Sequence, residues 1–197
     1  MTGREQSVRY HPRMQNDMQD KVVLITGGAK RVGAVIARRL HAAGARLMLH
    51  YRSSEAEADA LKNELNARRA DSVSLVQADL LDIAGLAQMV KNTVARFEHL
   101  DVLINNAGIL RDKSFAKMDM PDFNLVLQVH VMGSANCTKA VWDTMRDQAY
   151  GRILMTTSST GLYGNFGQAN YGAAKLGLAG FTKTLHLEGA KYNVRVN

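Results

Sequence analysis

The chain has 197 residues, of which 46% are hydrophobic and 22% are charged, a composition typical of one soluble globular domain with a sizeable core. The formal net charge is +7, but the basic residues are dispersed along helical segments, so we expect no nucleic acid partner; a basic nucleic-acid-binding protein is the alternative. No apolar run reaches the length of a membrane span, and the single cysteine, Cys137, excludes a disulfide framework and a thiolate metal cluster and favours a reducing cytoplasm.

Strands and helices are predicted to alternate from residue 21 onward. Residues 1–20 are polar, lack the apolar middle of a signal peptide and are expected to form a mobile extension. Short apolar runs predict strands at 21–26, 46–51, 72–77, 101–105, 151–157 and 193–197. Helical spacing predicts helices at 31–43, 55–68, 83–97, 121–145 and 171–189. The alternation predicts one domain at 21–197, a doubly wound parallel α/β sheet that binds ligands at the carboxyl ends of its strands. Cys137 falls in a predicted helix, where we expect a small buried hydrophobe; a catalytic thiol is the alternative.

The segment TGGAKRVG, Thr26–Gly33, connects the first predicted strand directly to the first predicted helix. Glycines there let the backbone approach a pyrophosphate, and the helix N-terminus supplies N–H donors and a positive potential. The spacing differs from the usual dinucleotide fingerprint of three glycines, and tight strand-to-helix packing also requires glycine. The position of the segment, at the first strand–helix turn, favours a dinucleotide site.

The end of the second predicted strand, HYRSS, indicates which dinucleotide binds. A carboxylate here would bind the adenosine ribose hydroxyls of NAD, whereas this chain has Tyr51, Arg52 and Ser53. Arg31 in the glycine-containing segment adds a second guanidinium. Two guanidinium groups and a hydroxyl suit a ribose phosphate, so we expect NADP(H) as the cofactor; a merely solvated Arg52 is the alternative.

Four motifs follow one another along the chain: TGGAKRVG, ADL at 78–80, NNAG at 105–108, and the set Ser158, Tyr171 and Lys175. Together they resemble the short-chain dehydrogenase/reductase family over residues 21–197. Residues 21–108 resemble bacterial pteridine reductases, including an arginine, Arg31, in place of the middle glycine of the family. From GILRDKSF onward the chain resembles the (3R)-hydroxyacyl-CoA dehydrogenase domain of multifunctional enzymes, and 3-oxoacyl reductases. The two halves therefore imply different substrates.

The resemblance implies roles at the positions that match the family. The implied cofactor site consists of Gly27, Lys30, Arg31, Val32, Gly33, Tyr51, Arg52, Ser53, Asp79, Leu80, Asn106, Ala107, Gly108, Tyr171 and Lys175. Within this site Asp79 would hydrogen-bond the adenine and Leu80 would flank it. The segment 106–108 would support the ribose on the nicotinamide side; a plain turn at a strand end is the alternative reading of NNAG.

One position departs from the family pattern. Members of the family usually carry an asparagine in the helix before the fifth strand, where it holds a water molecule for proton relay. This chain has His130 there, as the hydroxyacyl-CoA branch tends to have. An imidazole passes protons at neutral pH, so we count His130 among the catalytic candidates; a structural histidine in a helix bend is the alternative.

The spacing of Ser158, Tyr171 and Lys175 fits acid–base chemistry on a carbonyl. Reduction by a dihydronicotinamide requires that the carbonyl oxygen be held, its developing charge stabilised and a proton delivered. Ser158 would donate a hydrogen bond to that oxygen and Tyr171 would supply the proton. Lys175 lies one helical turn after Tyr171, where an ammonium group favours the phenolate and can also bind ribose hydroxyls.

These residues predict an NADP(H)-dependent oxidoreductase that acts on a small-molecule carbonyl, with no metal and no membrane partner, and that forms a homo-oligomer when full length. Pteridine reductases commonly have aspartate in place of this serine, so Ser158 favours a 3-oxoacyl thioester or a similar ketone. The alternatives are a pteridine reductase and a catalytically silent dinucleotide-binding fragment.

The sequence stops at Asn197, inside the last predicted strand, so the sheet is expected to be truncated in or after its sixth strand. Family members continue with a Pro-Gly turn, a cofactor-contacting threonine, a loop that covers the substrate and a final strand. We therefore expect the chain as given to bind NADP(H) weakly and to turn over poorly or not at all, and a longer version to be active.

Overall fold

The computed structural model describes residues 18–197, so most of the extension predicted at 1–20 lies outside the described residues. Within the described part of that extension, the turn Met18–Asp20 contacts the domain, because the Asp20 N–H donates to the Gly44 carbonyl at 3.1 Å. The described elements therefore begin slightly before the predicted domain boundary.

Six parallel strands form one sheet with the order β3-β2-β1-β4-β5-β6. The strands are β1 (Val22–Ile25), β2 (Arg46–Tyr51), β3 (Val73–Gln77), β4 (Val102–Asn105), β5 (Gly151–Met155) and β6 (Val194–Val196). The strand order reverses between β1 and β4, which is where a doubly wound sheet opens a binding crevice. The predicted fold class is confirmed.

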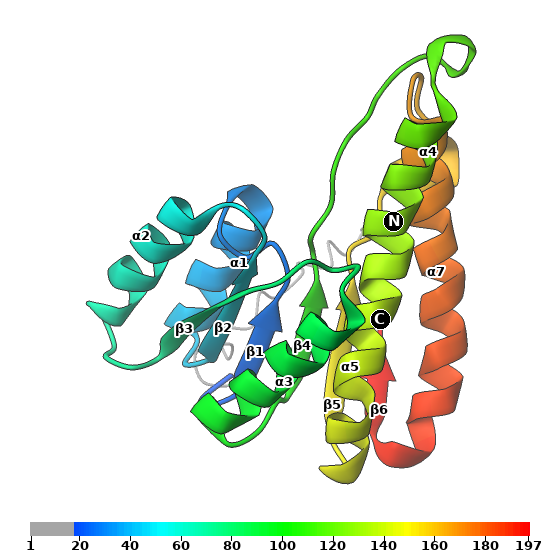
Figure 1. Ribbon diagram of the computed structural model, residues 1–197. Helices are drawn as coiled ribbons and strands as arrows, with labels where there is room; N and C mark the ends of the chain where they lie inside the picture. The colour runs from blue at the N-terminus through cyan, green and yellow to red at the C-terminus, as the bar shows by residue number, and fades with distance from the viewer. Residues whose placement is uncertain (1–17) are drawn as a thin grey trace, which may run out of the picture.

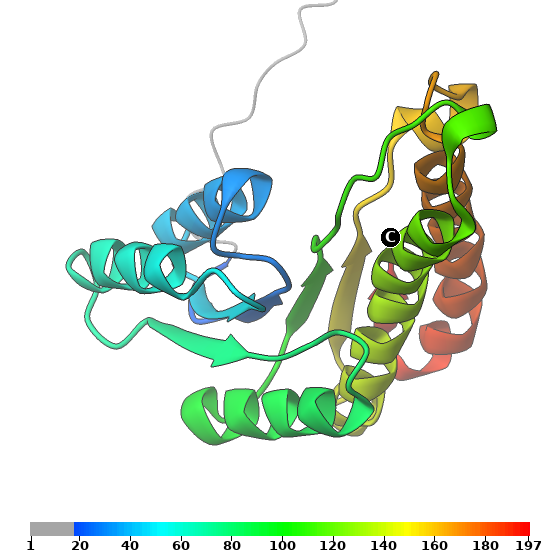
Figure 2. The same ribbon diagram turned by 45° about the horizontal axis from the view of Figure 1, so that its top comes forward.

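Helices cover both faces of the sheet (Figures 1 and 2). The helices are α1 (Arg31–Ala42), α2 (Glu55–Asn66), α3 (Ile83–Phe97), α4 (Met120–Leu127), α5 (Gly133–Asp147), α6 (Ser159–Tyr163) and α7 (Ala169–Gly189). Short turns of 3-10 helix lie at Phe115–Lys117 and Ala190–Tyr192. α1 and α2 pack on one face, and α3, α5 and α7 pack on the other.

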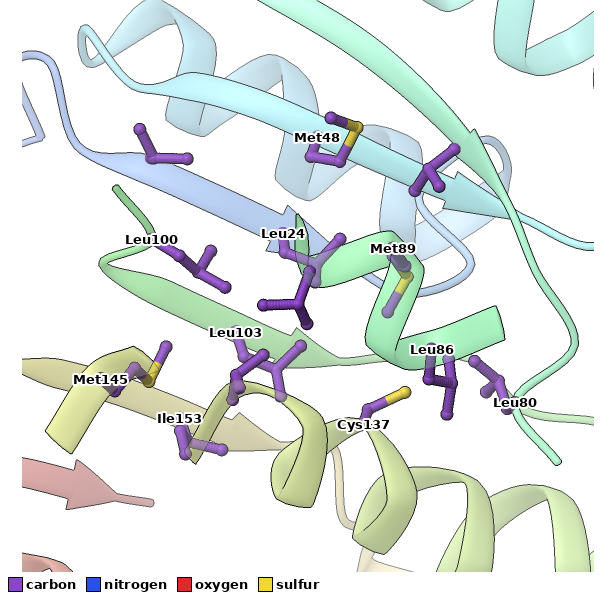
Figure 3. Packing of buried hydrophobic residues seen from close by; sticks show 14 of the residues in the cluster. Leu24, Met48, Leu80, Leu86, Met89, Leu100, Leu103, Cys137, Met145 and Ile153 are labelled. Atoms are coloured by element: carbon purple, nitrogen blue, oxygen red, sulfur yellow. The ribbon is translucent and has the colours of Figure 1, made fainter. Parts of the chain in front are cut away.

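The alternation of side chains along β1 divides the core into two layers. Leu24 points into the layer under α3 and α5, where Leu103 and Met145 also lie (Figure 3). Val23 and Ile25 point into the other layer, beneath α1 and α2. Residues i and i+2 of a strand share a face, so an unbroken apolar strand such as β1 supplies both layers at once.

The helix predicted at 121–145 is interrupted. α4 and α5 are joined by a π-helical turn, Gln128–Met132, that contains His130. A π turn accommodates one extra residue and changes which side chains face the neighbouring elements. Cys137 lies on α5 and is completely buried, and burial raises the pKa of its thiol to about 12, so it is a small buried hydrophobe as expected.

The loops that follow β4 and β5 run side by side away from the sheet to α4 and α6 (Figures 1 and 2). The Lys113 N–H donates to the Gly167 carbonyl at 2.9 Å, and the Asn170 Nδ2 donates to the Arg111 carbonyl at 3.0 Å. These contacts fix the start of α7, and therefore Tyr171, relative to the end of β4.

Candidate active site

The reversal point of the sheet carries two of the predicted motifs, which are hydrogen-bonded to each other. Thr26 Oγ1, at the end of β1, accepts from the N–H groups of Asn106 and Ala107 at 3.0 and 3.1 Å. The Asn106 Nδ2 donates to the carbonyls of Thr26 and Gly27 at 3.0 and 3.1 Å. The NNAG segment is thus joined to the segment Thr26–Gly33, hereafter the glycine loop. Sequence reasoning did not single out Thr26, because a threonine at a strand end is common.

The glycine loop has the geometry of an anion site. A Cβ at position 33 would lie 2.2 Å from the Gly27 carbonyl oxygen and 2.8 Å from the Asn106 Nδ2, so this position needs glycine. Lys30, the residue before α1, makes no side-chain cap, and the first turn of α1 contains no acidic residue. The first N–H groups of that helix therefore face a position where a pyrophosphate would satisfy them.

The remaining loop residues that were predicted to contact cofactor differ in their surroundings. Arg31 has a φ of +48°, a left-handed conformation that a non-glycine residue adopts under some strain, and its side chain is exposed. Val32 is 61% exposed. Lys30 pairs with Glu57 at 2.6 Å across the loop.

Residues predicted at the adenosine end are placed together, but two of them pair with one another. The Nε of Arg52 lies 3.3 Å from Asp79 Oδ2, and both side chains are well exposed, so the pair contributes little to stability and opens readily. Ser53 is exposed, whereas Tyr51 is buried with Ala29 and Ala58, so its side chain lies beneath the protein surface at this end of the site.

Leu80 lies beside this end, nearly buried against the core. Its carbonyl accepts from Asn136 Nδ2 of α5 at 3.0 Å. Asn136 was not predicted, because its partner lies 56 positions earlier in the chain.

Ser158 lies just beyond β5 and is the residue that begins α6. Its Oγ accepts from the Thr160 N–H at 3.2 Å, as an N-cap residue does. A serine hydroxyl that accepts in this way still has its own hydrogen to donate, so Ser158 remains able to hold a carbonyl oxygen. α6 packs tightly on α7, since a Cβ at Gly161 would lie 2.8 Å from the Leu176 amide nitrogen.

Tyr171 and Lys175 lie one turn apart on α7. The Lys175 Nζ lies 5.4 Å from the centroid of the Tyr171 ring and donates to the Thr156 carbonyl, at the end of β5, at 2.5 Å. The lysine is 3% exposed, and burial lowers its pKa to about 8. At neutral pH the group is still mostly an ammonium, with further N–H donors available beside the phenol.

His130 completes the cluster. Its ring is buried and lies perpendicular to the Tyr171 ring, with 5.3 Å between centroids. Its Nε2 lies 2.8 Å from the Ile109 carbonyl oxygen and 3.1 Å from the Ile109 amide nitrogen. Burial lowers the pKa of His130, and the charge of Lys175 lowers it further, while the bond to Ile109 raises it.

Gly108 is required by this histidine, because a Cβ there would lie 2.3 Å from His130 Cε1. The His130 Nδ1 has no partner among the described residues. The structure thus brings His130, Tyr171 and Lys175 together at the carboxyl end of β4 and β5, with Ser158 on the helix that packs against α7.

Comparison with known proteins identifies the family. The profile described as short chain dehydrogenase matches residues 21–197, which is nearly all of the chain. The chain belongs to the short-chain dehydrogenase family. Members of this family bind a nicotinamide dinucleotide, and the match includes the glycine loop, the NNAG segment and the cluster around Tyr171.

Three relatives show what this short-chain dehydrogenase chain is similar to. It is 42% identical over 188 residues to the peroxisomal hydratase-dehydrogenase-epimerase of Saccharomyces cerevisiae, covering 91% of this chain and 20% of the relative. It is 40% identical over 177 residues to a 3-oxoacyl-[acyl-carrier-protein] reductase of Synechocystis, covering 90% of this chain and 71% of the relative. It is 37% identical over 177 residues to an acetoacetyl-CoA reductase of Allochromatium vinosum, covering 90% and 72%.

The chain spans less than two thirds of the length of several relatives, including 20% of the yeast protein. The named relatives agree with the resemblance of the C-terminal half to 3-oxoacyl reductases and multifunctional enzymes. None of these three carries the name of a pteridine reductase, so that part of the predicted resemblance gains no support from them.

Within residues 18–197, which the structure describes, no helix is both long and apolar enough to cross a membrane. No group of three or more His, Cys, Asp or Glu side chains among them is arranged to hold a metal ion.

Proposed function

We propose that this protein is an NADP(H)-dependent oxidoreductase of a 3-oxoacyl thioester, carried on CoA or an acyl carrier protein, or of a similar ketone. The observation that carries the proposal is the cluster of Tyr171, Lys175 and His130 at the carboxyl end of the sheet, with Ser158 capping the helix that packs on α7. The names of the Synechocystis and Allochromatium relatives support the substrate class.

The role of each side chain follows from the hydrogen-bond donor group that it carries. When bound, the nicotinamide supplies a hydride to the carbonyl carbon in reduction, or takes one from it in oxidation. The Ser158 hydroxyl hydrogen bonds to the carbonyl oxygen and the Tyr171 phenol transfers its proton to that oxygen, which gives the alcohol. The Lys175 ammonium stabilises the phenolate that remains, and its bond to the Thr156 carbonyl keeps it beside the ring.

We assign His130 to proton supply for this step. Its ring contacts Tyr171 edge to face, and its lowered pKa keeps it neutral at physiological pH. With a hydrogen on Nε2 for the Ile109 carbonyl, Nδ1 is a buried acceptor that can take up a proton, and the imidazolium so formed can then pass a proton on toward Tyr171.

The cofactor preference follows from the end of β2. Arg52 and Ser53 are exposed there, and Arg31 is exposed at the start of α1, so a 2′-phosphate that displaces Asp79 from Arg52 would have two cations and a hydroxyl as partners. We expect NADPH to bind at least about tenfold more tightly than NADH, since a hydrogen-bonded charge pair contributes 1.5–3 kcal/mol. Arg52→Asp should reverse the preference. Equal affinities of the unmodified protein for the two cofactors, measured by fluorescence titration, would contradict the proposal.

Turnover with matched substrates, measured with a version that continues past Asn197, tests the activity. With NADPH, acetoacetyl-CoA should be reduced and dihydrobiopterin should not; the opposite result would make the protein a pteridine reductase. Tyr171→Phe should lose more than nine tenths of the rate while binding NADPH almost as before, because general-acid catalysis contributes about 100-fold or more. Tyr163→Phe is the matched control, since that phenol is 86% exposed on α6 and should keep the rate.

Two further features belong to the proposal. Leu176 and Leu187 are exposed on α7, and a hollow between α5 and α7 is lined by Trp142, Phe181 and Leu185, which supports a homo-oligomer that uses this face. Light scattering of the purified protein tests it. A single cysteine, Cys137, supports a reducing compartment such as the cytoplasm.

A further inference from the structure

His50, on β2, connects two segments of the cofactor region although it lies below the surface. It is 1% exposed. Its Nδ1 lies 3.2 Å from the Gly27 amide nitrogen, and its Nε2 lies 3.0 Å from the Ala78 carbonyl oxygen. Its own carbonyl accepts from the Gly28 N–H at 3.0 Å. One residue of β2 thus contacts both the glycine loop and the segment that leads from β3 into α3.

These partners determine where the imidazole carries its hydrogen. A backbone N–H only donates, so Nδ1 must accept from Gly27. A carbonyl oxygen only accepts, so Nε2 must donate to Ala78. The neutral form with hydrogen on Nε2 satisfies both partners, and neither the opposite tautomer nor the charged imidazolium does.

Both partners stand next to residues of the dinucleotide site. Gly27 begins the turn of the glycine loop with a φ of +60°, and a Cβ there would lie 3.0 Å from the Ala107 Cα. Ala78 directly precedes Asp79, at the adenosine end. The spacing between the pyrophosphate turn and the adenosine end therefore depends on the His50 ring that spans it.

We propose that His50 is a positioning residue for the dinucleotide, and that its neutral Nε2–H form holds the glycine loop and the Ala78–Leu80 segment at the separation the cofactor needs. The inference rests on the proposed binding of the dinucleotide at the glycine loop. Protonation of His50 directs a second N–H at the Gly27 amide, so the loop loses its acceptor and the cofactor loses affinity.

The surroundings fix the direction of the pH effect. Burial lowers the pKa of His50 below its ordinary 6.5, while the Ala78 carbonyl and the Asp79 carboxylate raise it in part. Asp79 is itself paired with Arg52. In the glycine loop, Lys30 is paired with Glu57 and Arg31 is exposed. His50 is therefore neutral at pH 7, and affinity for the dinucleotide should fall as the pH drops through a value below 6.5.

The experiment measures binding of ADP-ribose by calorimetry between pH 8 and pH 5.5. ADP-ribose lacks the phosphate monoester of NADPH, whose own pKa is about 6 and would obscure the result. In His50→Asn the amide oxygen takes the place of Nδ1 and does not titrate, whereas the shorter side chain leaves the Ala78 carbonyl without its donor. Its affinity at pH 8 should therefore fall by less than about tenfold, and the loss at acid pH should disappear.

His50→Leu leaves the Gly27 N–H and the Ala78 carbonyl without partners, so it should bind about tenfold more weakly at every pH. His41→Leu is the matched control. His41 is also a buried histidine with a pKa lowered by burial, but its Nε2 contacts Ser72 Oγ at 2.8 Å, away from the predicted cofactor residues. Its replacement should lower stability and leave the affinity and its pH profile unchanged.

The outcomes separate this inference from the proposed function. If the unmodified protein binds ADP-ribose and His50→Asn keeps the same loss at acid pH, His50 does not position the dinucleotide. If the unmodified protein fails to bind ADP-ribose and NADPH alike, the proposed function is wrong and the inference with it. Nitrogen NMR of the unmodified protein at pH 7 gives a second test that needs no variant and so does not depend on a variant folding correctly. It reports which nitrogen of His50 carries the hydrogen, and a hydrogen on Nδ1 would overturn the inference.

Discussion

The replacement Lys175→Met tests whether the charged Lys175 side chain lowers the stability of the folded protein. Lys175 is 3% exposed, and burial lowers its pKa from 10.5 to about 8. Each tenfold change in proton affinity corresponds to about 1.4 kcal/mol, so the buried ammonium destabilises the folded state by roughly 3 kcal/mol at pH 7. The folded-state pKa is the lower of the two, so this penalty is complete below pH 8 and is relieved as the pH rises from 8 toward 10.5.

Urea denaturation of the two proteins at pH 7 and pH 10 measures the effect. Methionine removes the charge and leaves the Thr156 carbonyl without its donor, but the second loss does not depend on pH. The stability of the unmodified protein relative to Lys175→Met should therefore rise by roughly 2 kcal/mol between pH 7 and pH 10. Reduction of the ketone should be lost in Lys175→Met at both pH values. A stability difference that is the same at pH 7 and pH 10 would refute the reasoning.

Three further predictions concern positions around the site. Gly33→Ala should lower the free energy of unfolding by about 2 kcal/mol, because its Cβ would meet the Gly27 carbonyl. Gly180→Ala, whose Cβ would meet no neighbouring atom of the described residues within 4 Å, should raise the free energy of unfolding by up to about 1 kcal/mol. Thermal melts compare the two variants, and equal effects would contradict the packing argument. His130→Leu should lower kcat by about tenfold or more, because the side chain proposed to supply the proton and its bond to the Ile109 carbonyl are both lost. His130→Asn keeps a polar group there and should lose less; steady-state kinetics measures both, and equal losses would count against the proposed role of His130. Cys137 should resist a thiol reagent until the protein unfolds, which mass spectrometry of the labelled chain detects; rapid labelling of the native protein would disprove its burial.

The strands and most helices were predictable from the sequence because their signals are local. The apolar run of β1 and the spacing of α3 each carry their pattern within a few residues, and the observed bounds of β2 and α3 match the predicted ones. The grouping of Tyr171 with Lys175 was also local, since residues one turn apart on a helix share a face.

Features that depend on contacts between distant segments were not predictable in this way. The π turn at His130 is confined to five residues between two α-helical segments, so the pattern predicted one continuous helix. α6 has five residues, too few to show a period, and starts at the Ser158 cap. The Arg52–Asp79 pair requires the ends of β2 and β3 to lie side by side, and the sequence around either residue does not indicate its partner. Likewise, nothing near His50 in the chain indicates that its ring spans Gly27 and Ala78.

The hydroxyl of Thr26 bears on the rate of dinucleotide association and on the conformational entropy that association costs. It accepts from two amides of the NNAG segment and donates to the Ile104 carbonyl oxygen, 3.3 Å away, so the hydroxyl orientation is fixed by three partners. These bonds join the end of β1 to the segment after β4 without any contribution from a cofactor. Little conformational entropy of these two segments is therefore left to be lost on association. The amides of Asn106 and Ala107 should then exchange with deuterium slowly even before any nucleotide is added, and capture should proceed in a single kinetic phase with no slow closing step.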